Sequence, residues 1–376
     1  MATQKRDYYR RGKAHLNDSM FSAFTKAVEE RAQELADAGK EKELEKFLKH
    51  ILDPSKLDGI ADKMVDDILK LSRKDVRKAV KLEHRQKLGF ERRLYKTYSR
   101  TIDAYIELLG ISIEAIQNHR KITHDNLGEK DTFLPFLLRL HARAHRNGNE
   151  ILALMQSGYG SGALARWRSM HETTTVLAYA KEQGPRIVKF MQDHEAVSSY
   201  KAMKVFQEHA ERLDQQPFSA YEVRLAKAKY DRRLAKYGRD FKKDYGWAWA
   251  ASGHTLQNFR DLEKHVGIDH LYPYYKLSSL NVHMEWRSLF VGEEFDALND
   301  PGIALIGPAD YGFEDAISLS LITLAYATIL ILTYNLSYES MVYAKVVMSV
   351  ERRAQDELSN EMDKLKKNAG KLDDNQ

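Results

Sequence analysis

The stretch Ser157-Gly-Tyr-Gly-Ser-Gly-Ala-Leu-Ala-Arg-Trp-Arg-Ser-Met-His-Glu-Thr-Thr-Thr-Val-Leu-Ala-Tyr-Ala180 decides how this chain is organised. Three glycines fall within five residues, a composition that ends one helix and lets the next begin close to it. From Ala163 onward the apolar residues recur with a helical period. Arg168 and Glu172 are four residues apart in this apolar context, so they share a face of the predicted helix. A charged pair that faces a core is costly unless its members satisfy each other, so this pair is either structural or part of a site.

The helical period extends over most of the chain. Only seven prolines occur in 376 residues, and amphipathic helical patterns cover 19–50, 57–83, 90–120, 132–156, 185–212 and 221–243. Residues 316–338 contain no charge and are long enough to span a bilayer. Ten of them are Ser, Thr, Asn or Tyr, however, and the apolar period continues beyond them. The sequence therefore predicts an all-α, multi-helix bundle built around a central buried helix, with no membrane span.

Composition divides the chain into three parts. Residues 1–89 are rich in charge and poor in aromatic residues, which is typical of an accessory helical segment. Residues 90–350 are predicted to form the main helical-bundle domain, and residues 351–376 a charged, partly disordered tail. The N-terminus has no apolar signal region and the chain has no cysteine. Both features are expected of a cytoplasmic protein.

Several classes of enzyme lack their motifs here. Without cysteine there are no disulfides, thiolate metal ligands or cysteine nucleophiles. The chain has no phosphate-binding loop, nucleophile elbow, His-Glu-x-x-His motif or Glu-x-x-His pair. His141 and His145 are spaced to hold a metal from one helical face, but no third ligand is evident. Because Arg139, Arg143 and Arg146 surround them, we interpret the two histidines as part of a surface basic patch, and we expect neither a metal nor a cofactor.

A second polar cluster follows Trp247. It contains Tyr274, Ser278 and His283 in a predicted helix. Such side chains must be hydrogen-bonded if they are buried. Two interpretations stay open. The cluster is either a polar network that fixes helix register or a pocket in which His283 performs acid–base chemistry.

These two regions resemble the signatures of a known family. Gly-Tyr-Gly followed by Ala-x-x-Arg-Ser-x-x-Glu, which ends at Glu172, is similar to the first signature of the bacterial domain-of-unknown-function family five-six-seven-seven. A Trp at Trp247, followed by Tyr-x-x-x-Ser and a His at His283, is similar to its second. The resemblance covers roughly residues 90–345. It implies an all-helical domain without an established reaction, and its shared polar positions are Arg168, Glu172, Ser278 and His283.

More loosely, the chain resembles HEPN-like helical domains, many of which are metal-independent ribonucleases of toxin and phage-defence systems. Their catalytic mark is an Arg and a His separated by four to six intervening residues, a spacing that Arg166 and His171 fit. Five such pairs occur in the chain, a number close to that expected by chance. Five residues of helix also rotate by about 140°. We therefore expect Arg166 and His171 to point in different directions.

The first expected function is metal-independent RNA cleavage by a toxin or phage-defence effector. In that case His283 or His171 acts as acid–base, Arg166 or Arg168 stabilises the phosphorane, and the 2′-hydroxyl attacks. The net charge of +5 permits RNA as a partner. The basic pattern at 221–243 either contacts the RNA backbone or is a solvated amphipathic helix.

The alternative is a non-catalytic helical interaction or sensor subunit of a defence system, in which both polar clusters are structural. Replacement of Glu172 by alanine should then cost several kcal/mol, as expected when one member of a buried pair is removed. A hydrolase that uses Glu172 as base also stays open. Besides RNA, the expected partners are a protein of the defence system and further copies of the chain in a homo-oligomer.

Overall fold

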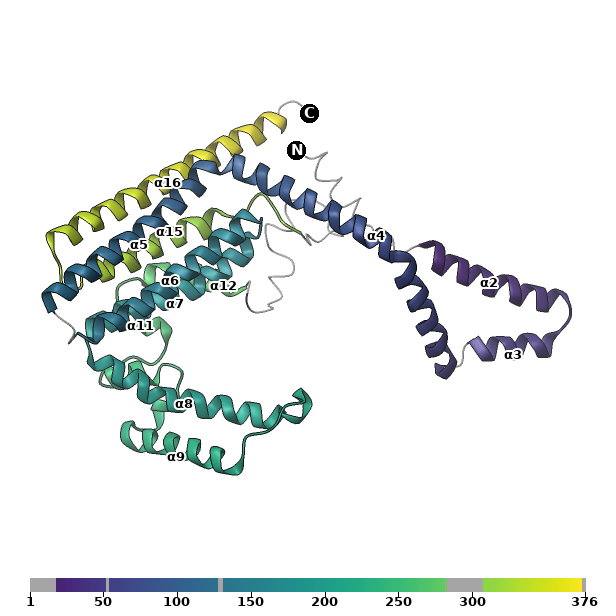
Figure 1. The fold of residues 1–376 in the computed structure, drawn as a ribbon, viewed down its shortest axis with the longest axis horizontal. Coiled ribbons are helices and arrows are strands. Elements are labelled where there is room, and N and C mark those ends of the chain that lie inside the picture. Colours follow the sequence, from purple (N-terminus) through teal and green to yellow (C-terminus); the bar gives the residue numbers. More distant parts are fainter. Residues whose placement is uncertain (1–17, 52–53, 128–130, 281, 283–306, 374–376) are drawn as a thin grey trace. The chain divides into compact units, whose positions relative to one another are not determined.

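The computed structural model describes residues 18–51, 54–127, 131–280, 282 and 307–373 (Figure 1). These residues form helices, and no β-strand occurs among them. The predicted all-α fold is therefore confirmed. The chain divides between Gly89 and Phe90 into two compact units, each with its own internal contacts.

The first unit contains α2 (Asp18–Asp37), α3 (Glu41–Ile51) and most of α4 (Pro54–Thr97). α2 and α3 pack against each other. The chain reverses between them at Gly39, whose φ of 67° lies in the left-handed region that glycine adopts without strain. Both helices carry exposed ion pairs between residues one helical turn apart, and each pair contributes little stability.

The second unit contains a bundle of long helices, namely α5 (Ser99–Leu127), α6 (Phe133–Gln156), α7 (Gly160–Gln183), α15 (Glu314–Leu332) and α16 (Tyr338–Asp373). α15 packs against all four of the others. Among the described helices it is the one long and apolar enough to cross a membrane, and 67% of its apolar segment is buried in the bundle. The prediction of a central buried helix is confirmed.

The start of α7 depends on its glycines. Gly158 has a φ of 88°, and its amide donates to the carbonyl of Met155 at the end of α6. A Cβ atom on Gly160 would lie 2.3 Å from the carbonyl oxygen of Gly312. The glycine cluster therefore both ends α6 and lets the backbone before α15 approach the first turn of α7, which brings these helices together.

We expect a Gly160→Ala variant to lose about 1–3 kcal/mol of unfolding free energy, because the added methyl group collides with backbone rather than with a flexible side chain. Gly162→Ala is the matched control. A Cβ there meets no atom closer than 3.6 Å, so alanine should be neutral or stabilise the helix by up to about 1 kcal/mol. Urea unfolding of both variants measures the difference, and equal stabilities would contradict the proposed close approach.

The structure differs from expectation at the C-terminus. Residues 351–373, predicted to be a charged and partly disordered tail, continue α16. Their apolar residues belong to a stripe that is buried in the bundle, namely Val347, Val350, Ala354 and Leu358. The carboxylate of Glu361 accepts hydrogen bonds from the amides of Arg100 and Thr101, so it caps the free N–H groups at the start of α5. High charge here marks the solvent side of an amphipathic helix.

A helical hairpin and several short helices complete the second unit. The hairpin consists of α8 (Arg186–His209) and α9 (Ala220–Tyr237). At its base the buried carboxylate of Asp193 holds the two helices together through Arg233, Lys236 and Tyr237. The short helices are α10 (Gly246–Ala251), α11 (Phe259–His265), α12 (Tyr272–Leu280) and the 3-10 turns Glu211–Leu213, Arg239–Lys242 and Asp269–Leu271.

Candidate functional site

The candidate site lies where α11 and α12 pack on α7. Asn258 caps the N-terminus of α11: its side chain accepts a hydrogen bond from the amide of Asp261 and so satisfies one of the free N–H groups of the first turn. Leu262 on α11 and Tyr275 on α12 are buried. These apolar contacts fix both short helices against α7 and direct the polar side chains of α12 toward Arg168.

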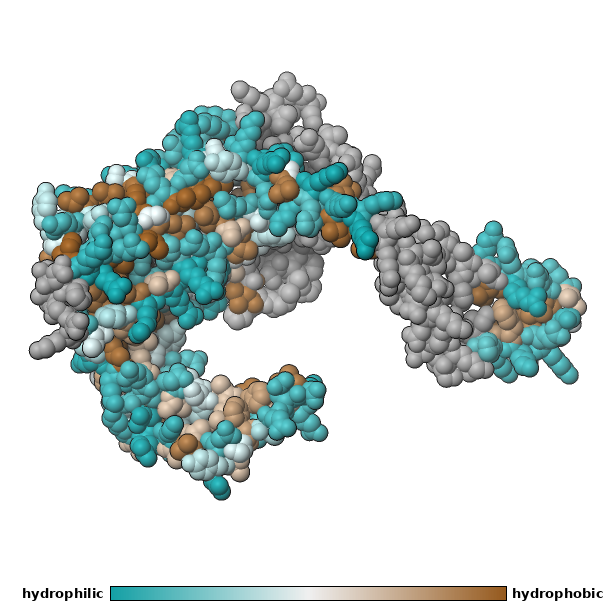
Figure 2. Space-filling model, viewed as in Figure 1, coloured by the Kyte–Doolittle hydropathy of each residue, from teal (hydrophilic) through white to brown (hydrophobic). Residues whose placement is uncertain are grey.

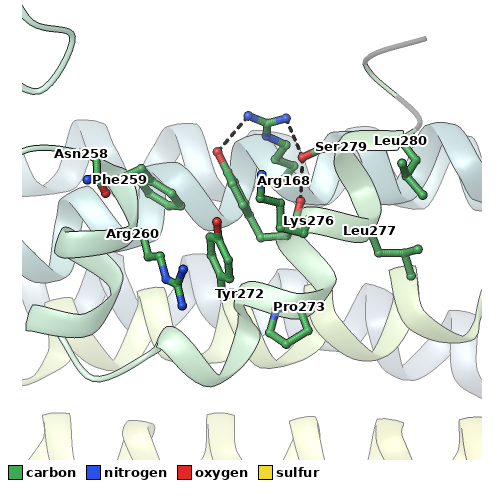
Figure 3. Close-up of a pocket in the computed structure, with 11 residues that line it drawn as sticks. Arg168, Asn258, Phe259, Arg260, Tyr272, Pro273, Lys276, Leu277, Ser279 and Leu280 are labelled. Carbon is green, nitrogen blue, oxygen red and sulfur yellow. Dashed lines mark hydrogen bonds between the residues drawn. The ribbon is translucent and has the colours of Figure 1, made fainter. Parts of the chain in front are cut away.

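Arg168 is the centre of a hydrogen-bonded cluster. Its guanidinium donates to the hydroxyl of Tyr275 at 2.9 Å and to Ser279 Oγ at 3.0 Å (Figure 3). Arg168 also pairs with Glu172 at 3.3 Å, and the Tyr275 hydroxyl donates to the same carboxylate at 2.5 Å. Burial, with the hydrogen bond to Glu172, raises the pKa of the Tyr275 phenol, which keeps this hydroxyl protonated as a donor.

The sequence predicted correctly that Arg168 and Glu172 share a helical face, but this face is not a dry core. Their side chains are 21% and 35% exposed. Solvent therefore weakens the ion pair, and its members remain accessible to a ligand.

Beside this cluster is an open pocket of about 650 Å³. Three cationic side chains line it, those of Arg168, Arg260 and Lys276, together with the rings of Phe259, Tyr272 and Tyr275. The guanidinium of Arg260 lies 4.6 Å from the ring centre of Tyr272, and that of Arg168 lies 4.5 Å from that of Tyr275. No carboxylate is among the described lining residues.

The charges of this pocket are unbalanced. Within the part of the chain that the structure describes, neither Arg260 nor Lys276 forms an ion pair. Glu172 lies nearby, but its carboxylate is paired with Arg168 and accepts the hydroxyl of Tyr275, so it does not neutralise Arg260 or Lys276. The pocket therefore presents positive charge on aromatic walls, an arrangement that attracts an anion with a flat, unsaturated part.

His171 lies behind the pocket in the core. Its Nε2 is 2.7 Å from a carboxylate oxygen of Glu263, and the two side chains are 1% and 0% exposed. The ring of Trp167 stacks on the imidazole. The second oxygen of Glu263 has no hydrogen-bond partner among the described residues. A group enclosed in this way does not reach a ligand in the pocket.

Sequence reasoning did not identify Glu263, although a signal was present. Phe259, Leu262, Glu263 and Val266 follow the i, i+3, i+4, i+7 spacing of a single helical face. Glu263 thus occupies a core position in an otherwise apolar stripe. A carboxylate there needs a buried partner, and His171 is that partner.

The other predicted residues are dispersed. Arg166 pairs with Glu150 and donates to Asn147 at 2.8 Å, both on α6, so it points away from His171 as the helical rotation predicts. Ser278 is fully buried, and its hydroxyl donates to the carbonyl of Tyr275 at 2.8 Å. His283 lies outside the described residues. The structure brings together Arg168 and Glu172, and it adds Tyr275 and Ser279 to them.

The interpretation of His141 as part of a surface patch is wrong. Its side chain is 3% exposed, and its Nε2 lies 3.3 Å from Ser112 Oγ and 3.2 Å from Thr328 Oγ1 in the core. Burial, helped by the nearby imidazole of His145, lowers the pKa of His141 to about 3. Among the described residues no group of three or more potential ligands is placed to hold a metal.

Comparison with known proteins finds a match to one family model, and this match assigns no activity. Neither the curated proteins nor the solved structures contain a match to this chain. The looser resemblance to HEPN-like domains stays a prediction. Residues 136–299 match the model of a family described as a family of unknown function, DUF5677. This match is narrower than the predicted span of 90–345, but it includes both signatures, so the segment that carries the Arg168 cluster and the pocket lies within the part of the chain that matches this family.

Proposed function

We propose that this protein binds single-stranded RNA through the pocket formed by α7, α11 and α12. One observation carries the proposal. Three cations and three aromatic rings line a single pocket, and the lining residues that the structure describes include no carboxylate. Guanidinium groups bind phosphate oxygens in pairs, and aromatic side chains stack on unpaired bases. A phosphate with its attached base satisfies both features at once.

The arrangement around Arg168 supports this assignment. Tyr275 and Ser279 hold the guanidinium by its two terminal nitrogens, at 2.9 and 3.0 Å. A cation that is held in position loses little side-chain entropy when it binds an anion. Arg260 and Lys276 form no ion pair within the described part of the chain, and they gain a counter-charge when a phosphate enters. The cavity volume of about 650 Å³ lies within the range of small-ligand sites.

Metal-independent cleavage of the bound RNA is the reaction we propose for a cytoplasmic toxin or phage-defence effector. In this scheme Arg168 stabilises the charge of the phosphorane and His283 supplies acid–base catalysis. His171 has no direct role, because Glu263 and Trp167 enclose it. The second candidate function is RNA sensing without cleavage, which is favoured by the burial of the one histidine that the structure describes at this site.

A binding measurement tests the assignment. The fluorescence anisotropy of a labelled RNA oligonucleotide should show an affinity loss of about tenfold or more for Arg260→Gln with Lys276→Gln, and a shallower dependence on salt, because two phosphate contacts are removed. Arg139→Gln is the control, since it removes an exposed cation of α6 outside the pocket. Equal affinities of the wild-type protein and the double variant would contradict the proposal.

Cleavage is measured separately on the same RNA by denaturing gel electrophoresis in the presence of a chelator. We expect product with the wild-type protein and none with His283→Ala or Arg168→Gln. If the wild-type protein binds RNA and leaves it intact, the sensing function replaces the catalytic one.

A further inference from the structure

Helices α8 and α9 form a hairpin (Figure 1), and hydrophobic residues lie on its surface among hydrophilic ones (Figure 2). Of residues 201–237, all of which the structure describes, only Ala210 is buried. The apolar residues with large exposed fractions near the turn of the hairpin are Leu213 (56%), Phe218 (38%), Tyr221 (68%) and Leu225 (44%). Two helices alone cover only their facing sides, so these residues form a surface that lacks a partner within the described chain.

One stripe of α9 combines this apolar surface with positive charge. Tyr221, Leu225, Lys229 and Arg232 follow one another at i, i+4, i+8 and i+11, so they share one face of the helix. All four are exposed. The face toward α8 is a different one, where Tyr230 packs on Tyr200 with ring centres 4.9 Å apart.

The hairpin also carries two sets of complementary charges. The carboxylates near the turn belong to Glu208, Glu211 and Asp214, and the free cations along α9 belong to Arg224, Lys229 and Arg232. All six side chains are exposed, and none forms an ion pair within the described part of the chain. The acidic set lies near the turn and the basic set extends along α9, so an antiparallel arrangement of two copies brings the two sets together.

We propose that two copies of this chain pair through α9, antiparallel about a two-fold axis near Leu225. Arg232 is seven residues beyond Leu225, about 10 Å along the helix, and Phe218 is seven residues before it. The axis therefore places Arg232 of one copy beside the acidic turn of the other. It also places Tyr221 opposite Lys229 of the second copy, where the ammonium lies on the ring face. A two-fold interface makes each contact twice.

The acidic residues of the turn favour a second copy of the chain, rather than RNA or an anionic membrane, as the partner of this surface. Glu208, Glu211 and Asp214 lie beside the apolar residues that a membrane or RNA would have to cover, and they repel phosphate. A partner for this surface must present apolar groups next to cations, and the stripe of α9 does so. The pairing is independent of RNA binding, because Arg260 and Lys276 lie on α11 and α12.

Sedimentation velocity in the micromolar range tests the pairing. We expect the wild-type protein to dimerise, and Leu225→Lys to weaken the dimer about tenfold or more, because a charge then lies at the centre of the interface. Leu225 is 44% exposed in the single chain, so the thermal melting curve of the Leu225→Lys variant should match that of the wild-type protein. Leu336→Lys is the control, since it places the same charge at a 56% exposed leucine outside the hairpin and should leave the dimer intact.

A charge exchange identifies the orientation. Arg232→Glu and Glu211→Lys should each dissociate the dimer, because each puts like charges together twice. An equimolar mixture of the two variants should restore it, since both contacts of the mixed dimer are then attractive. A monomeric wild-type protein throughout this concentration range would overturn the proposal, as would a mixture that stays monomeric. A loss of RNA affinity in Arg232→Glu, with a monomeric wild-type protein, would assign the surface to nucleic acid instead.

Discussion

A Glu263→Ala variant should lose about 3–5 kcal/mol of unfolding free energy, because it leaves His171 without its partner in a dry core. The two side chains are 0% and 1% exposed, and they are bonded at 2.7 Å. Domains of ordinary stability unfold with about 5–15 kcal/mol, so the loss would remove a large fraction of the total. Urea unfolding followed by circular dichroism measures it as a lower midpoint with an unchanged slope.

Glu172→Ala is the informative comparison. From the sequence this carboxylate was expected to be the buried partner whose removal costs several kcal/mol. In the structure its pair with Arg168 is 35% and 21% exposed, so we expect a loss below about 1 kcal/mol. The large loss of unfolding free energy is therefore expected for Glu263→Ala and not for Glu172→Ala. Equal losses of unfolding free energy in the two variants would contradict this assignment.

A double variant separates two quantities: the stability lost when one member of the His171–Glu263 pair is removed, and the net contribution of the intact pair to the unfolding free energy. With His171→Leu and Glu263→Leu together, no polar group remains unpartnered. Apolar replacements of similar volume often match or exceed the stability of a buried pair. We therefore expect the double variant to recover most of the stability that Glu263→Ala loses. If the double variant is as unstable as Glu263→Ala, the loss of stability comes from altered packing around Trp167 and not from an unpaired polar group.

The helical fold could be predicted because it follows from local patterns. The apolar period, the glycines before α7 and the uncharged segment of α15 each act over a few residues of sequence. The terminal part of α16 was missed because its charge was given more weight than its apolar stripe. The burial of Leu358 and the capping of α5 by Glu361 show that the stripe determines the structure there.

The candidate site could be predicted only in part, because its contacts are remote in sequence. The Arg168–Glu172 pair lies within one helix, and its four-residue spacing predicts from the sequence alone that the two side chains share a face. Tyr275 and Ser279 reach Arg168 across more than a hundred residues. Which face of α12 meets α7 is decided by the packing of the short helices that precede it, and no local pattern contains that information.

Acid should destabilise the fold through His141. Burial, with a smaller contribution from His145, lowers the pKa of this imidazole to about 3 in the folded protein, whereas an unfolded histidine has a pKa near 6.5. Between these values the unfolded chain binds the additional proton. The contribution of neutral His141 to stability is therefore complete above about pH 6.5 and is lost progressively as the pH falls toward 3. At pH 4.5 the expected loss is about 3 kcal/mol.

A His141→Gln variant isolates this effect from the other titrating groups. Glutamine offers hydrogen bonds to Ser112 and Thr328 but does not titrate. Burial also lowers the pKa values of His119, His145 and His194, but these residues remain in both proteins and their contributions cancel. Unfolding free energies measured from pH 7.5 to 4.5 should fall more steeply for the wild-type protein, by up to about 1.4 kcal/mol per pH unit. Parallel curves would mean that His141 binds its proton in the folded state, which requires water or a conformational opening to reach the centre of the bundle.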